Sequence, residues 1–540
     1  MIDSSDIGMT QGRLHHADGT FSDYIVVRFL SAGLHFSDID QSDPQAKLKD
    51  IAHWRYFKVC EQGESRPAII AFLRLERDQP VGAVFPDLSH ITDSGEELLS
   101  ANSFITYTMR ALLSRGWLRY EKGTWRVATP QSESEWRRRG QAVIRRLASQ
   151  NRLHLELGPG RRPPERLDFG DIPVDVYKDL IAVDRCGFLS DVVWRKRPRL
   201  VFNTSFFLLE EDDFFSYHSA LGEAYNLWVS DGIIHRPPLY RRGAIFSHGD
   251  GRWKVGFFAL SDLGITLPNG LRLLPRHIPL PTRAVPFTLN DDGPSDLTLY
   301  TRYYGVASRG RVLGYTPTEA GRFELTVVDR RIVGWKMGGN LALPQNGFVI
   351  SFAPGVLSPA TVSELRNALR TRFLLNYHFV NPEHQTIKQA MQAGPLLFQD
   401  GRSVLTNTYL EDNEQFWASR ALDDGAWQIG AVPTDFQTGV DQGRYARVGL
   451  GADDVGNLVL VVVAGVERGV GIPGVDSYGA TLVELVDLLV EAGAVNAVNL
   501  DGGGSTQAYY LGGQAVVPGN RRGLPRVHYE RMVPSVGILF

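Results

Sequence analysis

The chain has 540 residues, of which 43% are hydrophobic and 22% charged, and its formal net charge is −3. This length predicts two or three domains, and the balanced charge excludes a general attraction to nucleic acid or anionic membranes. No apolar run reaches the roughly 18 residues of a membrane span, and residues 1–6 carry no export signal, so we expect a cytoplasmic protein without a membrane partner. Cys60 and Cys186 lack a metal-ligand spacing, which fits a reducing compartment.

Residues 1–130 are predicted to form a separate small α+β module. Strand-like segments at 24–30 and 67–74 precede two helical segments within 93–113 and a hairpin at 116–127. Helix, helix and hairpin is the order of a winged-helix module, and it is also the order of many α+β fragments. No dense Lys/Arg face accompanies the pattern, so we favour the second alternative and do not expect nucleic acid as the main partner.

Residues 131–165 are predicted to connect this module to the rest of the chain. The first part is an Arg-rich helix, whose cations are typical of a solvated helix face. The second part, 158–165, is dense in proline and glycine, which interrupt regular structure. We therefore predict a larger second domain over residues 166–540.

The larger domain begins with several predicted strands. The segment 199–207 is an apolar strand that contains Asn203, a residue type that strand centres disfavour, so its amide needs a specific partner. A helix is predicted from Ser358 at the N-cap and Pro359 at the first helical position to about residue 375. Further strands are expected at 296–305, 323–333 and 347–352.

A strand, a helix and a second strand follow each other at 457–464, 478–492 and 495–500. Gly493 stands where a helix commonly ends. This order predicts a βαβ unit with a right-handed crossover and a ligand site beyond the carboxyl ends of its strands. Asp501 follows the second strand directly, so we expect it at that site.

A glycine turn continues from Asp501. Gly502, Gly503 and Gly504 can adopt positive φ and leave main-chain N–H groups exposed, and Ser505 and Thr506 add hydroxyl donors. Such a turn suits the oxygens of a phosphate or a sugar. The alternative is a structural glycine hairpin in which Asp501 only caps the turn.

Five motifs of the chain resemble the phosphodiester glycosidase family in order and spacing. A weaker similarity at 202–207, where Thr204 and Ser205 replace a glycine pair, extends the resemblance back to about residue 166. The resemblance implies a mixed-sheet catalytic domain with helices packed on it, and a hydrolase that cleaves the bond between a sugar C1 and a phosphodiester oxygen. The five motifs are 393–401, 444–451, 457–463, 476–482 and 498–506.

Cleavage of this bond needs stabilisation of an oxocarbenium-like centre on the sugar, a nucleophile or activated water, and positive charge near the leaving phosphate. We predict Asp501 as the catalytic carboxylate, Arg447 as the phosphate clamp and Asn203 as a hydrogen-bonding partner of the sugar or phosphate. The alternatives are a turn cap for Asp501, a surface ion pair for Arg447 with Arg444 as the substitute clamp, and a buried polar bridge between strands for Asn203.

Further residues are expected to bind the substrate, a small-molecule or glycan phosphodiester. Asp476 and Ser477 precede the predicted helix 478–492, whose N-terminus favours anions, although Thr481 and Glu484 are also suited to capping it. The full predicted binding set is Gly502, Gly503, Gly504, Ser505, Thr506, Asp476, Ser477, Arg444 and Gly394.

No cofactor is expected to be required. A divalent cation, Ca²⁺ or Mg²⁺, would take Asp501 and Asp476 as oxygen ligands if one is bound. His218, His235 and His248 lack the spacing of metal ligands. The alternative to a hydrolase is a non-catalytic carbohydrate- or nucleotide-binding module whose N-terminal unit recruits a partner or nucleic acid.

Overall fold

The structure is a computed structural model of the whole chain. Predictions for helices at 93–113, for the Arg-rich helix and for the linker at 158–165 lie outside the described residues, as does His218. The structure describes the backbone of short strands within 56–183 and 420–428, and residues 7–30, 33–39, 189–208, 223–279, 284–293, 295–368, 374–405, 414–415, 443–466, 471–516, 531 and 533–540.

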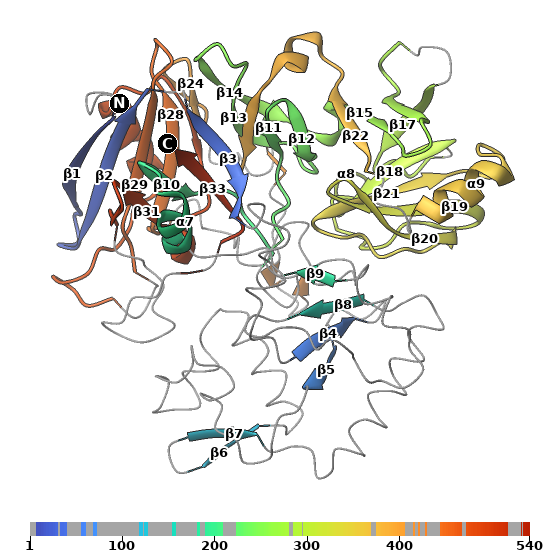
Figure 1. Cartoon of the computed structure of the whole chain (residues 1–540), viewed down its shortest axis with the longest axis horizontal. Coiled ribbons are helices and arrows are strands. Elements are labelled where there is room, and N and C mark those ends of the chain that lie inside the picture. Colours follow the sequence, from blue (N-terminus) through green and yellow to red (C-terminus); the bar gives the residue numbers. More distant parts are fainter. Residues whose placement is uncertain are drawn as a thin grey trace.

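One sheet has seven strands and combines residues from both ends of the sequence (Figure 1). All neighbouring strands in it are antiparallel. In spatial order the strands are β1 (Ile7–His15), β2 (Phe21–Phe29), β29 (Leu458–Val463), β28 (Arg447–Ala452), β30 (Asn496–Asn499), β24 (Leu396–Gln399) and β25 (Arg402–Ser403).

Helix α11 (Leu482–Glu491) covers one face of this sheet. Alternate residues of β29 face α11 or the main core, so the strand is buried on both sides and its sequence is continuously apolar. Thr481 and Glu484 cap the helix reciprocally, and Gly493 follows it with φ 90°. The predicted helix and both of its end signals are therefore confirmed, although the helix begins at Leu482.

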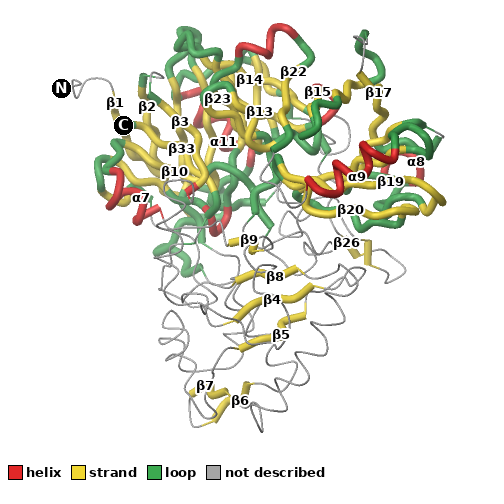
Figure 2. Tube along the Cα trace, turned by 45° about the vertical axis from the view of Figure 1, so that its right-hand side comes forward, coloured by secondary structure: helices red, strands yellow, loops and turns green. Residues whose placement is uncertain are grey.

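A second sheet has five antiparallel strands and lies beside the first (Figure 2). Helix α7 (Leu189–Lys196) packs on it through Leu189 and Val192. The strands in spatial order are β3 (Leu34–Asp38), β33 (Ser535–Leu539), β10 (Leu200–Asn203), β31 (Ala508–Tyr510) and β32 (Gly513–Gln514).

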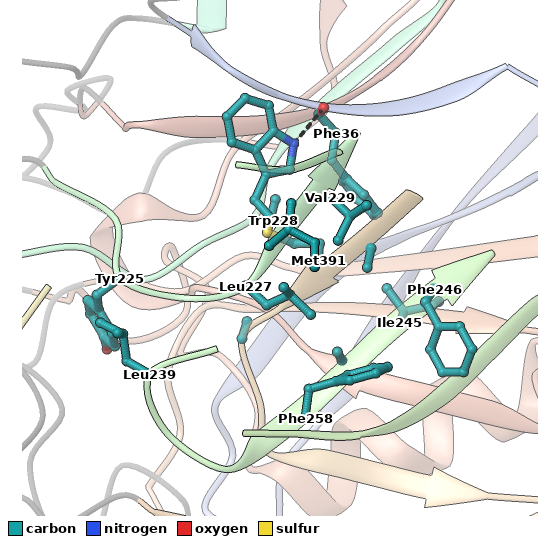
Figure 3. Close-up of a cluster of buried hydrophobic side chains, with 14 of the residues drawn as sticks. Phe36, Tyr225, Leu227, Trp228, Val229, Leu239, Ile245, Phe246, Phe258 and Met391 are labelled. Carbon is teal, nitrogen blue, oxygen red and sulfur yellow. Dashed lines mark hydrogen bonds between the residues drawn. The ribbon is translucent and has the colours of Figure 1, made fainter. Parts of the chain in front are cut away.

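A third sheet supplies the aromatic core shown in Figure 3. The indole N–H of Trp228 donates to the carbonyl of Phe36 at 3.0 Å, which ties this sheet to β3. Phe246 and Phe258 pack edge to face in the same core. The strands in spatial order are β12 (Ile233–Arg236), β11 (Trp228–Ser230), β23 (Gln389–Gln392), β13 (Arg242–Ser247) and β14 (Trp253–Phe258).

The fourth large sheet has eight strands and forms the side of the molecule opposite β1 in Figure 1. It is mixed, because β17 pairs in parallel with both β16 and β18. Helices α8 (Val306–Arg309) and α9 (Pro359–Ala368) belong to this side. The strands in spatial order are β20 (Arg331–Gly339), β19 (Thr318–Val328), β21 (Gly347–Phe352), β18 (Leu297–Thr301), β17 (Ala284–Leu289), β16 (Arg272–Pro275), β15 (Leu263–Thr266) and β22 (Asn376–Phe379).

The pairing of the first strands of the chain does not follow the predicted division into domains. β2 pairs along its length with β29, and β3 pairs with β33, so these strands belong to the sheets of the larger domain and not to a separate module over 1–130. Strand β8 (His154–Leu157) pairs with β4 (Tyr56–Cys60) and, across the predicted boundary, with β9 (Ile181–Val183). Alternating apolar residues predicted strands correctly but could not show which distant strands they pair with.

The predicted βαβ unit also needs correction. β29 and β30 run parallel, as expected, but β28 lies between them and is antiparallel to both. Gly449 allows this arrangement, because a Cβ there would lie 2.8 Å from Leu489 of α11. The described part of the chain is therefore mainly β, with few helices, and none of its helices has the length and apolar character that crossing a bilayer requires.

Candidate functional site

Asp501 lies at the carboxyl end of β30, as predicted, and starts the glycine turn. The N–H of Leu500 still donates to Val448 of β28, and the N–H of Asp501 donates to the carbonyl of Thr204 at 2.9 Å. The turn is thus held between the seven-stranded sheet and the end of β10. Asp501 is only 5% exposed in this position.

The carboxylate of Asp501 is poised between its two protonation states. Burial raises the pKa of Asp501 to about 7, against the lowering effects of the Ser505 hydroxyl, the charge of Arg531 and the N–H of Gly502. Its Oδ2 is buried and has no hydrogen-bond partner in the described part of the structure. A carboxylate with this pKa can exchange a proton near neutral pH.

Two glycines of the turn leave room for atoms that lie close to the main chain. Gly503 has φ 57°, as the predicted positive φ requires, but its N–H donates to the carbonyl of Ala446 at 2.8 Å and does not face outward. A Cβ on Gly502 would lie 2.7 Å from that same carbonyl. A Cβ on Gly504 would lie 2.5 Å from the guanidinium of Arg531, so the absence of a side chain lets Arg531 reach the turn.

Arg531 is the cation of this site, and the sequence analysis missed it. Its Nη1 lies 3.5 Å from the hydroxyl of Ser505, and its charge acts on Asp501. Its main-chain carbonyl accepts a hydrogen bond from Gln507 at 2.7 Å. The available signal was an arginine just before the last apolar strand, β33, which pairs with β10.

Five buried polar atoms around the turn have no hydrogen-bond partner among the residues that the structure describes. Such atoms are costly to bury unless a ligand or water satisfies them. Their concentration on one short segment and the arginine beside it indicates a ligand site. The atoms are Asn499 Oδ1, Asp501 Oδ2, Thr506 Oγ1, Gln507 Oε1 and Arg531 Nε.

Asn203 holds the turn through its side-chain amide. Its Nδ2 donates to the carbonyl of Asp501 at 2.7 Å, and its Oδ1 accepts from the N–H of Gln507 at 2.9 Å. These contacts favour the alternative of a buried polar bridge. Thr204 Oγ1 donates to Ser535 at 3.0 Å, and the N–H of Ser205 also donates to Ser535, so this segment is tied to β33 as well.

Arg447 lies at the start of β28, and its main chain passes beside Gly502. Arg447 is only 3% exposed. Its guanidinium donates to the carbonyls of Ala480 at 3.0 Å and Gly443 at 2.9 Å. These contacts hold the segments that flank β28 and α11. Arg444 forms ion pairs near the surface with Glu484 at 3.1 Å and Asp18 at 3.5 Å.

The other predicted binding residues divide into two groups. Gly394 is close to the turn, because its main chain exchanges hydrogen bonds of 3.0 Å with Asn499. Asp476 accepts from the N–H of Ile472 at 2.7 Å, and Ser477 accepts from the N–H of Asp23 at 2.9 Å. Asp476 and Ser477 therefore stabilise the chain before α11, and no described contact brings them to Asp501.

No three His, Cys, Asp or Glu side chains gather as metal ligands in the part of the chain that the structure describes. The two predicted oxygen ligands, Asp501 and Asp476, belong to no such group among these residues. His235 stacks on Trp228 with ring centroids 4.2 Å apart, and His248 contacts Thr386 at 2.8 Å. These contacts give both histidines structural partners.

Glu414 is a second buried carboxylate that the sequence analysis did not select. Its Oε1 accepts from the N–H of Gly243, and its Oε2 accepts from the N–H of Leu396 at 2.7 Å. Burial raises the pKa of Glu414 to about 7, although these two hydrogen bonds lower it. Glu414 therefore joins β13 to β24, two strands of different sheets.

Comparison with known proteins gives the family of the C-terminal part. Residues 324–540 match the phosphodiester glycosidase family, which confirms the resemblance of the five motifs, all of which lie in this range. The extension of the resemblance to about residue 166 stays a prediction. No curated protein matches the chain. Similar solved structures include a hypothetical protein from Synechocystis, with 14% identity and a TM-score of 0.40 over 99% of this chain; this chain spans 62% of that protein's length.

Two more solved structures are similar at the same level. A protein from Burkholderia pseudomallei has 16% identity and a TM-score of 0.37, covering 99% of this chain and 97% of that one. The zebrafish N-acetylglucosamine-1-phosphodiester alpha-N-acetylglucosaminidase catalytic domain, auto-inhibited by its pro-peptide, has 10% identity and a TM-score of 0.33, covering 99% of this chain and 82% of that one.

Proposed function

Because residues 324–540 match the phosphodiester glycosidase family, we propose that this chain hydrolyses a glycosyl phosphodiester at the Asp501 turn. The observation that carries the proposal is the pair formed by Asp501 and Arg531. In the described part of the chain, Asp501 has a buried carboxylate oxygen without a partner, and the guanidinium of Arg531, whose Nε also lacks a partner, lies beside the same turn. The carboxylate of Asp501 suits the water that attacks the sugar carbon, and the guanidinium of Arg531 suits a phosphate.

Arg531 takes the role of phosphate partner in this proposal. A guanidinium binds two phosphate oxygens through a planar pair of donors, and the Ser505 hydroxyl beside it adds another donor. As the bond to the sugar breaks, negative charge grows on the departing phosphate monoester. The fixed cation lowers the energy of that state.

Asp501 takes the role of general base for water. Its ionised form removes a proton from a water molecule, the water oxygen bonds to the sugar C1, and the C1–O bond breaks with its electron pair leaving on the phosphate monoester. Asn203 acts as a positioning residue, because both of its amide hydrogen bonds fix the main chain on either side of the turn. One carboxylate used in this way inverts the configuration at C1.

The test is a set of synthetic glycosyl phosphodiesters, with release of reducing sugar and of phosphate monoester measured together. We expect turnover by the wild type and by Asp487→Ala, an exposed aspartate on α11, and none by Asp501→Ala. Equal turnover by Asp501→Ala would remove Asp501 from the reaction. Tight binding of a sugar phosphate by the wild type without any turnover would support the non-catalytic binding module instead.

A further inference from the structure

The end of helix α7 carries a dense group of cations beside an exposed tryptophan. Trp194 is 80% exposed. The cations follow it directly in the sequence, at the end of α7 and in the short segment that leads into β10. Figure 1 shows α7 beside β10. A surface tryptophan with this exposure has no packing role in the fold that would explain it. The cations are Arg195, Lys196, Arg197 and Arg199.

A second exposed apolar side chain lies against the same group. Leu511 is 61% exposed at the turn between β31 and β32. Its N–H donates to the carbonyl of Arg199 at 2.8 Å, so the main chain of the turn and that of Arg199 lie at the same end of the five-stranded sheet. We call Trp194, Arg195, Lys196, Arg197, Arg199 and Leu511 the α7 patch.

Two residues of the α7 patch have backbone conformations that favour glycine. Arg197 has φ 48° and Leu511 has φ 47°. Arg197 directly follows α7, and Leu511 lies in the turn between β31 and β32. A large side chain in the left-handed region costs folding free energy relative to glycine, so glycine at either position should not destabilise the fold. The side chains of Arg197 and Leu511 are both exposed, so they can contact a partner outside the protein.

Three cations of the α7 patch have no acidic partner in the described part of the protein. Lys196, Arg197 and Arg199 form no ion pair with a described acidic residue. Burial lowers the pKa of Lys196, and the neighbouring charge of Arg195 lowers it further. Cations crowded in this way gain from an anionic partner.

We propose that the α7 patch docks the protein on an anionic phospholipid bilayer. Tryptophan prefers the membrane interface, leucine at the turn adds apolar contact with the acyl region, and lysine and arginine reach the phosphates with their long side chains. A nucleic acid offers phosphates but no apolar layer for Leu511. The expectation of no membrane partner came from the overall charge of −3 and from the lack of an apolar run long enough to span a bilayer, and neither describes a local patch.

The α7 patch and the Asp501 turn lie at opposite ends of β10. The α7 patch lies at the start of β10, and Asn203 at the other end of β10 holds the turn. The three residue steps from Leu200 to Asn203 span about 10 Å, so Asn203 lies about that far from the docked end of the sheet. The docking proposal does not depend on the proposed hydrolysis, and either can fail without the other.

The test is cosedimentation of the full chain with vesicles, using an equal mixture of phosphatidylserine and phosphatidylcholine, and phosphatidylcholine alone. We expect binding to the anionic vesicles that weakens with salt. Arg197→Gly should weaken it about fivefold by removing one cation. Leu511→Gly should weaken it about tenfold by removing apolar contact. Both variants should keep or raise the melting temperature, because glycine suits these φ values.

The matched control is Asn340→Gly, which also replaces a residue of positive φ (58°) by glycine. Asn340 directly follows β20 of the eight-stranded sheet, so this change should leave vesicle binding unchanged. The proposal would be overturned by no binding to vesicles, by no preference for the anionic vesicles, or by an equal loss of binding in the control. Binding to a single-stranded DNA oligonucleotide as tight as to the anionic vesicles would also overturn it and indicate a general polyanion site.

Discussion

Asp501 and Glu414 are both buried carboxylates whose pKa is raised to about 7 by burial, yet their surroundings differ. Glu414 receives one main-chain N–H on each oxygen, from two strands that it joins. Asp501 keeps an oxygen without a partner among the described residues and has Arg531 beside it. A raised pKa alone therefore does not distinguish a functional carboxylate from a structural one, whereas unsatisfied oxygens next to a cation do.

The largest expected effect is on activity. Asp501→Asn keeps the shape of the side chain and removes its charge, so turnover of a glycosyl phosphodiester should fall about 100-fold to 10,000-fold, the usual range for a catalytic acid or base. The measurement is kcat on purified, folded protein. Near wild-type turnover would make Asp501 structural, as Glu414 is, and would end the contrast between them.

Asp501→Asn should also change the pH dependence of stability. The folded pKa of about 7 lies above the usual 3.8, so the neutral form of Asp501 favours folding at low pH, and this contribution is lost as pH rises from about 4 to 7. At pH 8 the variant should therefore melt at a higher temperature than the wild type. A lower melting temperature at pH 8 would contradict the burial of an ionised carboxylate at this turn.

The next effect is on stability and concerns Glu414. Glu414→Gln replaces one acceptor oxygen by an NH₂ group that faces a main-chain N–H, so the free energy of unfolding should fall by about 2–4 kcal/mol. Denaturant unfolding measures this loss. Under conditions where the variant is folded, its kcat should stay within a few-fold of the wild type, and a 100-fold loss there would give Glu414 a role in the reaction.

Arg531 should affect both rate and pH profile. Arg531→Gln removes the fixed cation, and we expect a loss of about 10-fold to 100-fold in kcat/KM, with partial recovery in Arg531→Lys. Because the charge of Arg531 lowers the pKa of Asp501, the rising limb of kcat/KM should move to higher pH in Arg531→Gln. Arg447→Gln is the comparison: it should lower the melting temperature and leave the position of the limb unchanged.

The smallest effects separate neighbouring glycines of the turn. Gly503→Ala places a Cβ in open space but at positive φ, so it should cost about 1–2 kcal/mol of stability with little change in activity. Gly504→Ala places a Cβ against the flexible guanidinium of Arg531 and should reduce kcat/KM as Arg531→Lys does. Equal kinetic losses in both variants would show that the turn acts as a whole and that Arg531 is not displaced.

The sequence predicted the parts of the site that depend on local pattern. The apolar run before Asp501 predicted a strand end, and Thr481, Glu484 and Gly493 predicted both ends of α11. Arg531 was not predictable in this way, because it lies 26 residues from Ser505 and reaches the turn only through the pairing of β33 with β10. The pairings of β2 and β3 were missed for the same reason, since partner choice depends on the whole core.

The prediction of Arg447 as the phosphate clamp rested on residue type and motif. The structure shows two of its donors on main-chain carbonyls, a contact that a sequence pattern does not reveal. Its clamp role, the cation site and the cytoplasmic location stay predictions. The kinetic comparison of Arg447 and Arg531 addresses the first of them directly.

The pairing of β2 with β29 and of β3 with β33 has a consequence for synthesis of the protein. Both N-terminal strands emerge from the ribosome long before their partners, which lie near the other end of the chain. Until then their apolar faces and open hydrogen-bonding edges are exposed to other chains, and contacts between such distant segments form slowly. Newly made chains should therefore depend on chaperones that shield β2 and β3 until β29 and β33 have been translated.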